Sequence, residues 1–214
     1  MSVQNMTLAD SLSEIDFDNT IACYDRLFIE VGIEIGGLRQ SIGQSKREVR
    51  DHVRKLPRGE EQWQRMQAEV YGPRMRHAEL YPGVTDFLET CYNRAIAVYI
   101  ISHKTEHATL GTGDVNLRTE ALKWMNAKKI IAPTGPGLRP GNIYFESTRE
   151  QKIARISELG CTHFIDDLVE VLDHANFPTT TERIHFAPGE QSLTGHSFPT
   201  VASWHEIRGA LFNV

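Results

Sequence analysis

The sequence predicts an α/β fold in which a parallel sheet of about five strands is flanked by helices. Three observations support this prediction. Short apolar segments recur along the chain, and amphipathic stretches lie between them. This alternation of strand and helix implies a parallel sheet. One long region without a convincing strand interrupts the alternation and predicts an inserted helical subdomain.

The predicted strands are short, and several are apolar throughout rather than alternating. Continuous apolar character is typical of strands that helices cover on both faces. The predicted strands are residues 13–17 (SEIDF), 95–101 (AIAVYII), 142–145 (NIYF), 162–165 (THFI) and 183–186 (RIHF).

Three amphipathic segments predict helices that flank this sheet. The first has apolar residues at positions i, i+3, i+4 and i+7, namely Val84, Phe87, Leu88 and Cys91. The second begins with Thr148 and Gln151 in capping-box spacing and ends at Gly160. The third follows residues 164–167 and has apolar side chains at Leu168, Val169, Val171 and Leu172.

The region between residues 24 and 80 predicts only helices. Its apolar residues form three patterns with helical spacing: Leu27, Phe28, Val31 and Ile35, then Val49, Val53 and Leu56, then Trp63, Met66 and Val70. Glycines and prolines separate the patterns. We therefore expect a core domain of residues 1–23 and 81–214 and a helical subdomain of residues 24–80. An extended crossover packed on the sheet is the alternative.

Composition and charge narrow the class of protein. A hydrophobic fraction of 40% in 214 residues is enough to bury a sizeable core. The net charge of −5 does not favour nucleic acid as a partner.

The sequence also bears on location. The polar first residues lack a secretory signal, and the longest apolar run, residues 95–101, is too short to cross a bilayer. We therefore expect no membrane association. Three widely spaced cysteines (Cys23, Cys91 and Cys161) form no CxxC pair, which favours a reduced, cytoplasmic location.

Two aspartates, Asp16 and Asp18, lie at the end of the first predicted strand. A helix-loop-helix calcium site starting at Asp16 would need Gly at its sixth position and Glu at its twelfth. The chain has Ile21 and Leu27 there, which excludes that site. A solvated turn remains an alternative for this stretch taken alone.

Other polar residues follow predicted strands or begin a helix: Ser102, Lys152, Asp166 and Asp167. The carboxyl ends of parallel strands share one edge of the sheet, where open α/β sheets bind ligands. We therefore expect these side chains to converge with Asp16 and Asp18. So many carboxylates would repel one another without a hard cation, and Mg²⁺ suits oxygen ligands best.

Taken in order, DFDNT at residues 16–20, Ser102, Lys152 and the pair 166–167 resemble the four motifs of the haloacid dehalogenase (HAD) superfamily. The segment YPGVTDFLE at residues 81–89 is also similar to that family. The resemblance implies a Rossmann-like core, a helical cap at residues 24–80, Mg²⁺ as cofactor and an aspartyl-phosphate intermediate. Dehalogenases of this superfamily typically lack the second acid, so Asp18 favours phosphate-ester chemistry.

The resemblance also implies a role for each matching residue. Asp16 would be the nucleophile and Asp18 the general acid and base. Ser102 and Lys152 would hold the phosphoryl oxygens, with help from backbone amides near Phe17 and Asn19, and His103 could reach the substrate. The metal ligands would be Asp16, the Asp18 backbone carbonyl, Asp166 and Asp167, the last directly or through water.

The expected activity is Mg²⁺-dependent hydrolysis of a phosphomonoester, with a small phosphorylated metabolite as the partner molecule. A phosphomutase is one alternative, although mutases usually have Gly where this chain has Asn19. A non-catalytic regulatory or binding protein is another, although neither Asp16 nor Asp18 is lost. The sequence determines neither the substrate nor the oligomeric state.

Overall fold

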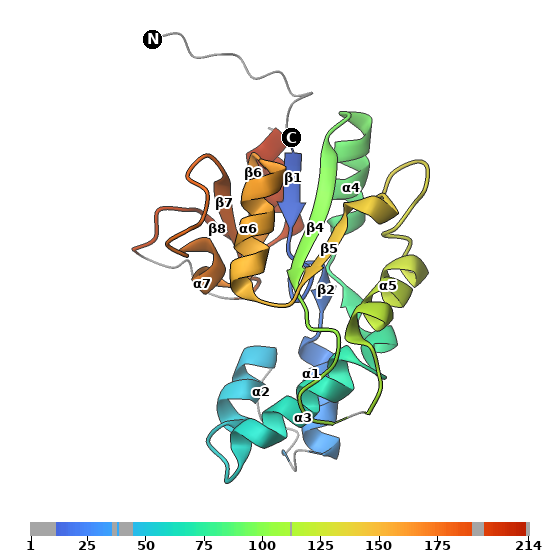
Figure 1. Cartoon of the computed structure of the whole chain (residues 1–214), viewed down its shortest axis with the longest axis vertical. Helices are drawn as coiled ribbons and strands as arrows, with labels where there is room; N and C mark the ends of the chain where they lie inside the picture. Colours follow the sequence, from blue (N-terminus) through green and yellow to red (C-terminus); the bar gives the residue numbers. More distant parts are fainter. Residues whose placement is uncertain (1–11, 36–37, 39–44, 112, 190–194, 213–214) are drawn as a thin grey trace. The chain divides into compact units, whose positions relative to one another are not determined.

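A computed structural model of the chain describes residues 12–35, 38, 45–111, 113–189 and 195–212. These residues form two compact units, whose helices and strands Figure 1 shows. Unit 1 comprises Met1–Ile21, Tyr81–His103 and Lys129–Val214, and unit 2 comprises Ala22–Leu80 and Lys104–Lys128. None of the described helices combines the length and the apolar character that crossing a membrane requires.

Unit 1 is built on a sheet of six parallel strands in the order β5-β4-β1-β6-β7-β8. The strands are β1 (Leu12–Ile15), β4 (Ala97–His103), β5 (Ile143–Glu146), β6 (His163–Asp166), β7 (Glu182–Phe186) and β8 (Thr200–Val201). The predicted fold class is confirmed. So is the expected central place of the first strand, which pairs with β4 on one side and β6 on the other.

Two details of the predicted sheet were wrong. The sheet has a sixth strand, β8, which pairs with the end of β7. Two residues are too few to show a periodic pattern, so no sequence pattern predicted β8. In addition, β4 continues to His103, so Ser102 lies within the strand and not just beyond it.

The described residues of unit 1 form the helices α4 (Val84–Asn93), α6 (Arg149–Leu159), α7 (Val169–Leu172) and α8 (Trp204–Phe212), with a short 3₁₀ turn, η3 (Pro140–Asn142). The predicted capping box of α6 is present, because Thr148 and Gln151 each bond the other's backbone, and Gly160 ends the helix in the left-handed region. Helix α8 was not predicted, although Trp204 and Ile207 have helical spacing and are both buried.

The helices cover both faces of the sheet. Helices α6 and α7 share one apolar cluster with the sheet, made of Ile101, Ile153, Ile156, Cys161, Phe164, Val171, Leu172, Phe177 and Phe198. Figure 1 shows α6 lying across the front of the sheet. On the other face, Trp204 of α8 contacts Phe87 of α4 and Phe186 of β7. Since neighbouring residues of a strand point to opposite faces, His185 faces the α6 side, where it contacts Phe198.

The bounds of unit 2 contain the predicted helical region, residues 24–80. Its elements are β2 (Ala22–Cys23), α1 (Asp25–Glu34), α2 (Lys46–Val53), α3 (Gly59–Tyr71), the 3₁₀ turn η2 (Met75–His77), β3 (Glu79–Leu80) and α5 (Leu117–Ala127). The expectation of no strand between residues 24 and 80 was wrong, because β3 pairs with β2 in an antiparallel ladder of two residues. Helix α5 was not predicted, although its buried residues Leu117, Ala121, Trp124 and Met125 have helical spacing.

Unit 2 has an aromatic core of its own. The ring of Phe28 stacks on Trp63 with centroids 4.7 Å apart, and Tyr71 packs edge-on against Phe28 and Tyr24. The Trp124 indole of α5 donates a hydrogen bond to the Ala78 carbonyl at 2.9 Å. This bond ties α5 to the end of η2, and unit 2 accordingly includes Lys104–Lys128 in addition to Ala22–Leu80.

Candidate active site

The candidate site lies at the carboxyl edge of the unit 1 sheet. Asp16 follows β1 directly, and its backbone N–H donates to the Ile165 carbonyl of β6 at 2.9 Å. Asp166 is the last residue of β6, so the two aspartates leave neighbouring strands at the same level. Ser102 lies near the end of β4, the strand on the other side of β1. The parallel register thus brings these three predicted residues to one edge.

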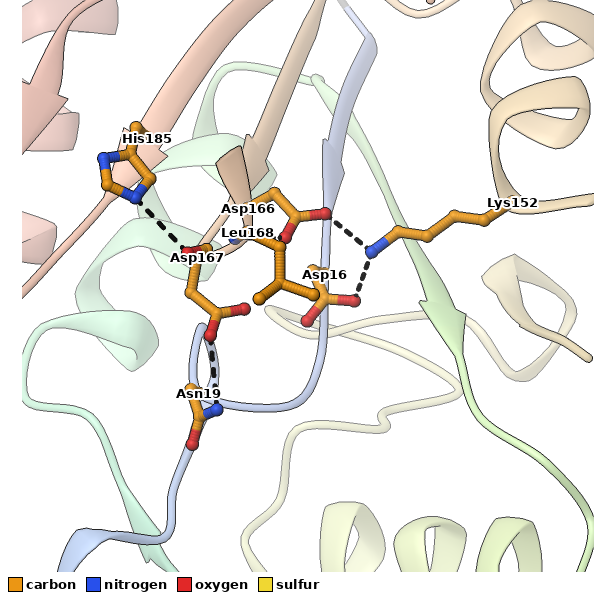
Figure 2. Close-up of polar contacts among 7 residues, drawn as sticks. All are labelled: Asp16, Asn19, Lys152, Asp166, Asp167, Leu168 and His185. Carbon is orange, nitrogen blue, oxygen red and sulfur yellow. Dashed lines mark hydrogen bonds and ion pairs between the residues drawn. The ribbon is translucent and has the colours of Figure 1, made fainter. Parts of the chain in front are cut away.

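Lys152 of α6 joins two of these carboxylates. Its ammonium lies 2.6 Å from Asp16 Oδ1 and 2.6 Å from Asp166 Oδ2, as Figure 2 shows. All three side chains are almost fully buried, at 1% exposure for Lys152 and 6% or less for the aspartates. Burial alone would lower the pKa of the Lys152 ammonium, but the charges and hydrogen bonds of the two carboxylates outweigh burial and raise it.

Burial and neighbouring charges together raise the pKa of Asp16 to about 7. Burial is the largest of these influences. Lys152 acts in the opposite direction, whereas the nearby carboxylates of Asp166 and Asp18 act in the same direction as burial. One ammonium therefore does not balance the carboxylates gathered here. A bound cation would favour the ionised form of Asp16.

Three of the predicted metal ligands fit a divalent cation. Asp16, Asp166 and Asp167 each offer a carboxylate oxygen, and these oxygens lie within 4.8 Å of one another. Carboxylate oxygens are the hard donors that Mg²⁺ prefers. The Asp18 carboxylate is not part of this group.

Buried polar atoms beside the carboxylates are suited to a ligand. The hydroxyls of Ser102 and Thr20 and the Asn19 carbonyl oxygen Oδ1 are buried, and none has a hydrogen-bond partner among the described residues. Leaving such atoms unsatisfied costs free energy, which a bound group with donors and acceptors would recover. Ser102, at 1% exposure, is therefore a candidate for holding an oxyanion.

Asp167 is held from two directions. The Asn19 amide Nδ2 donates to Asp167 Oδ2 at 3.2 Å, and His185 Nε2 donates to the Asp167 backbone carbonyl at 3.3 Å (Figure 2). The neighbouring Leu168 N–H donates to Asp166 Oδ1 at 2.8 Å. The sequence did not indicate either the Asn19 side chain or His185 as part of the site, since each contact joins residues far apart in the chain.

Two further predicted residues have identifiable neighbours. The Phe17 side chain is fully buried and its backbone carbonyl accepts from Ile21 N at 3.0 Å, whereas the contact expected of Phe17 is through its backbone amide. The His103 side chain is exposed, and its ring Nε2 lies 3.1 Å from the Ser147 carbonyl.

Glu14 is a buried acid that no pattern in the sequence indicated. It lies in the middle of β1, is fully buried, and neither of its carboxyl oxygens has a hydrogen-bond partner among the described residues. The Cys161 thiol lies beside it but contacts the Ile156 carbonyl at 3.4 Å, so it satisfies Glu14 only weakly. Burial raises the pKa of Glu14 to about 8. The side chain is therefore held protonated at neutral pH.

This burial predicts a pH-dependent stability. Glu14 ionises near 4.5 in the unfolded chain but only near 8 in the folded chain, so between these values the folded chain binds the extra proton. The free energy of unfolding therefore falls as pH rises through this window. We expect Glu14→Gln to gain about 2 kcal/mol relative to wild type between about pH 5 and about pH 7, measured by urea unfolding. The exposed Glu89→Gln is the control, and identical pH curves for wild type and Glu14→Gln would contradict the prediction.

Comparison with known proteins gives a similarity in structure. No protein-family model matches the chain, and no curated protein matches its sequence. Among solved structures, a HAD family hydrolase from Deinococcus radiodurans R1, with bound phosphate and sodium, superposes with a TM-score of 0.59 at 13% identity, covering 95% of each chain. A HAD-superfamily hydrolase from Geobacter sulfurreducens gives a TM-score of 0.55 at 12% identity, covering 98% of this chain and 100% of that one.

A third similar structure shows that the fold alone does not select the chemistry. A dehalogenase gives a TM-score of 0.53 at 13% identity, covering 98% of this chain and 99% of that one. At these identities the comparisons show the fold, which is that of the HAD-like hydrolases. The chemistry therefore has to be argued from the residues of the site and not from the fold.

Proposed function

We propose that this chain, which has the fold of the HAD-like hydrolases, is a Mg²⁺-dependent phosphomonoesterase acting on a small phosphorylated metabolite. One observation carries the proposal: the buried Asp16, paired with Lys152, is followed two residues later by a second acid, Asp18. A reaction that only displaces halide needs one carboxylate nucleophile. Two carboxyl groups side by side suit a reaction in which an alcohol must be protonated and water then activated.

In the first step, an Asp16 carboxylate oxygen attacks phosphorus and the bond from phosphorus to the ester oxygen breaks. The Asp18 carboxyl gives its proton to that oxygen, so the alcohol leaves neutral. Asp16 then carries the phosphoryl group as an acyl phosphate. In the second step, the Asp18 carboxylate takes a proton from water as the water attacks phosphorus. Inorganic phosphate leaves and both aspartates return to their starting state.

The other residues of the site stabilise charge during these steps. The Lys152 ammonium and the buried Ser102 hydroxyl would hold phosphoryl oxygens, where a low-dielectric setting strengthens each hydrogen bond. Asp16, Asp166 and Asp167, with the Asp18 carbonyl, would hold Mg²⁺. When bound, Mg²⁺ offsets the repulsion between the Asp16 carboxylate and the phosphate. We also propose that the helical region at residues 24–80 acts as the cap that selects the substrate.

The direct test is turnover of p-nitrophenyl phosphate by the full chain, with Mg²⁺ and with a chelator. We expect phosphate release that requires Mg²⁺, and no halide release from a 2-haloalkanoate under either condition. Halide release would overturn the proposal. So would the absence of phosphate release from every substrate tested, namely p-nitrophenyl phosphate and a panel of sugar phosphates and nucleotides.

Asp18→Asn should show which steps need Asp18. The p-nitrophenolate group leaves without protonation, so we expect a burst of about one equivalent, followed by steady turnover slowed about 10²- to 10⁴-fold because water is no longer activated. An alkyl phosphate, whose leaving group needs the proton, should show no burst. Rapid-mixing kinetics with both substrates make the measurement. Near-normal steady turnover of the alkyl phosphate would contradict the assigned role.

A further inference from the structure

We propose that the side chain of Asn19 is a positioning residue that orients the Asp167 carboxylate for metal binding. The inference rests on the proposed function, since it concerns the metal that this activity requires. It assigns to Asn19 a role for its side-chain amide, whereas the sequence suggested only a backbone contact to phosphate.

The hydrogen bonds from Asn19 and His185 fix different parts of Asp167. His185 is 3% exposed, and its bond to the Asp167 carbonyl fixes the backbone relative to β7. His185 is held in turn through Nδ1, which lies 3.3 Å from the Thr200 hydroxyl of β8. Rotation of the Asp167 side chain remains, and the 3.2 Å bond from Asn19 Nδ2 restricts it (Figure 2). Groups that orient metal ligands in this way affect metal affinity strongly.

The conformation of Asn19 explains why asparagine suits this position. Its φ is 60°, in the left-handed region, within a turn that the bond from Ile21 N to the Phe17 carbonyl closes. Glycine adopts this φ most readily, and asparagine is among the few other residues that tolerate it. Glycine has no amide to donate, whereas the longer glutamine has the amide but not the same tolerance. Asparagine meets both requirements.

The neutral charge of the amide also matters. Lys152 places a positive charge against Asp16 and Asp166, which reduces their attraction for a cation. The Asn19 amide orients Asp167 without adding positive charge, so that carboxylate keeps its full attraction for a metal. The orientation of the Asn19 amide costs free energy, because its Oδ1 is left buried without a partner among the described residues. The hydrogen bond from Nδ2 to Asp167 holds the amide in this orientation despite that cost.

The test measures Mg²⁺ binding to the full chain without substrate, by isothermal titration calorimetry. Asn19→Gly keeps the backbone conformation and removes only the amide, so the variant should fold normally, as metal-free urea unfolding will check. We expect it to bind Mg²⁺ about tenfold more weakly than wild type. Mg²⁺ affinity equal to that of wild type would overturn the inference.

A double-mutant cycle separates positioning from a general loosening of the turn. If Asn19 acts through Asp167, Asn19→Gly should cause less than about a twofold further loss of affinity in the Asp167→Ala background. A full tenfold loss in that background would mean that the turn, which also carries Asp16 and Asp18, has moved, and would overturn the inference. A wild-type chain that binds no Mg²⁺ would overturn both this inference and the proposed function, whereas normal binding that Asn19→Gly leaves unchanged would overturn this inference alone.

Discussion

Asp16→Asn is expected to lower the turnover of p-nitrophenyl phosphate at least about a thousandfold. Asparagine has nearly the size and shape of aspartate, and its carbonyl oxygen can still accept the hydrogen bond that Lys152 donates to Asp16 Oδ1. The amide is not a nucleophile towards phosphorus, so the acyl phosphate cannot form. Steady-state kinetics measure the loss, and circular dichroism shows whether the variant is folded.

Whether a phosphoenzyme forms tests the role of Asp16 as nucleophile more directly than the loss of turnover does. We expect rapid acid quenching with labelled phosphate ester to trap a phosphorylated chain in Asp18→Asn, where the second step is slow, and none in Asp16→Asn. Asp18→Asn is the matched control, because it makes the same chemical change two residues away. Equal labelling of both variants would mean that the nucleophile is another residue.

Lys152→Met is expected to lower the free energy of unfolding by about 3–5 kcal/mol in a chelator. Methionine fills a similar volume, but it leaves two buried carboxylates, Asp16 and Asp166, facing each other without the ammonium that lies 2.6 Å from each. The cost comes from this uncompensated charge and not from lost packing. Urea unfolding measures the change through the transition midpoint, provided that the slope is unchanged.

Arg155→Met provides the control on the same helix. Arg155 also pairs with two acids, Glu146 at 3.0 Å and Glu158 at 2.7 Å, but its side chain is 30% exposed. Such partly exposed pairs contribute about 0–1 kcal/mol, so this variant should remain close to wild type in stability. Mg²⁺ should recover more stability in Lys152→Met than in wild type, because it restores positive charge between the carboxylates. Wild-type stability of Lys152→Met in a chelator would contradict this account.

The sequence determined the fold class because the strands of unit 1 have an unusually clear pattern. Residues such as Ile100, Ile101, Phe164 and Ile165 are buried in pairs, so their strands are apolar throughout and distinct from the amphipathic helices. The capping box and Gly160 likewise determined both ends of α6 from local chemistry alone. The sequence did not reveal β3 and β8, since two residues cannot show a period.

The sequence also determined which polar residues lie at or near the ends of the central strands, and the parallel fold then implied that Asp16, Ser102 and Asp166 share an edge. Residue order contains no information about side-chain partners across the sheet. Lys152 and Asp16 are 136 residues apart and Asn19 and Asp167 are 148 apart, so only the tertiary structure decided these pairs. The same is true of Glu14, whose raised pKa comes from the helix and strands packed around it. Burial and distance set these energies, and both exist only once the chain has folded.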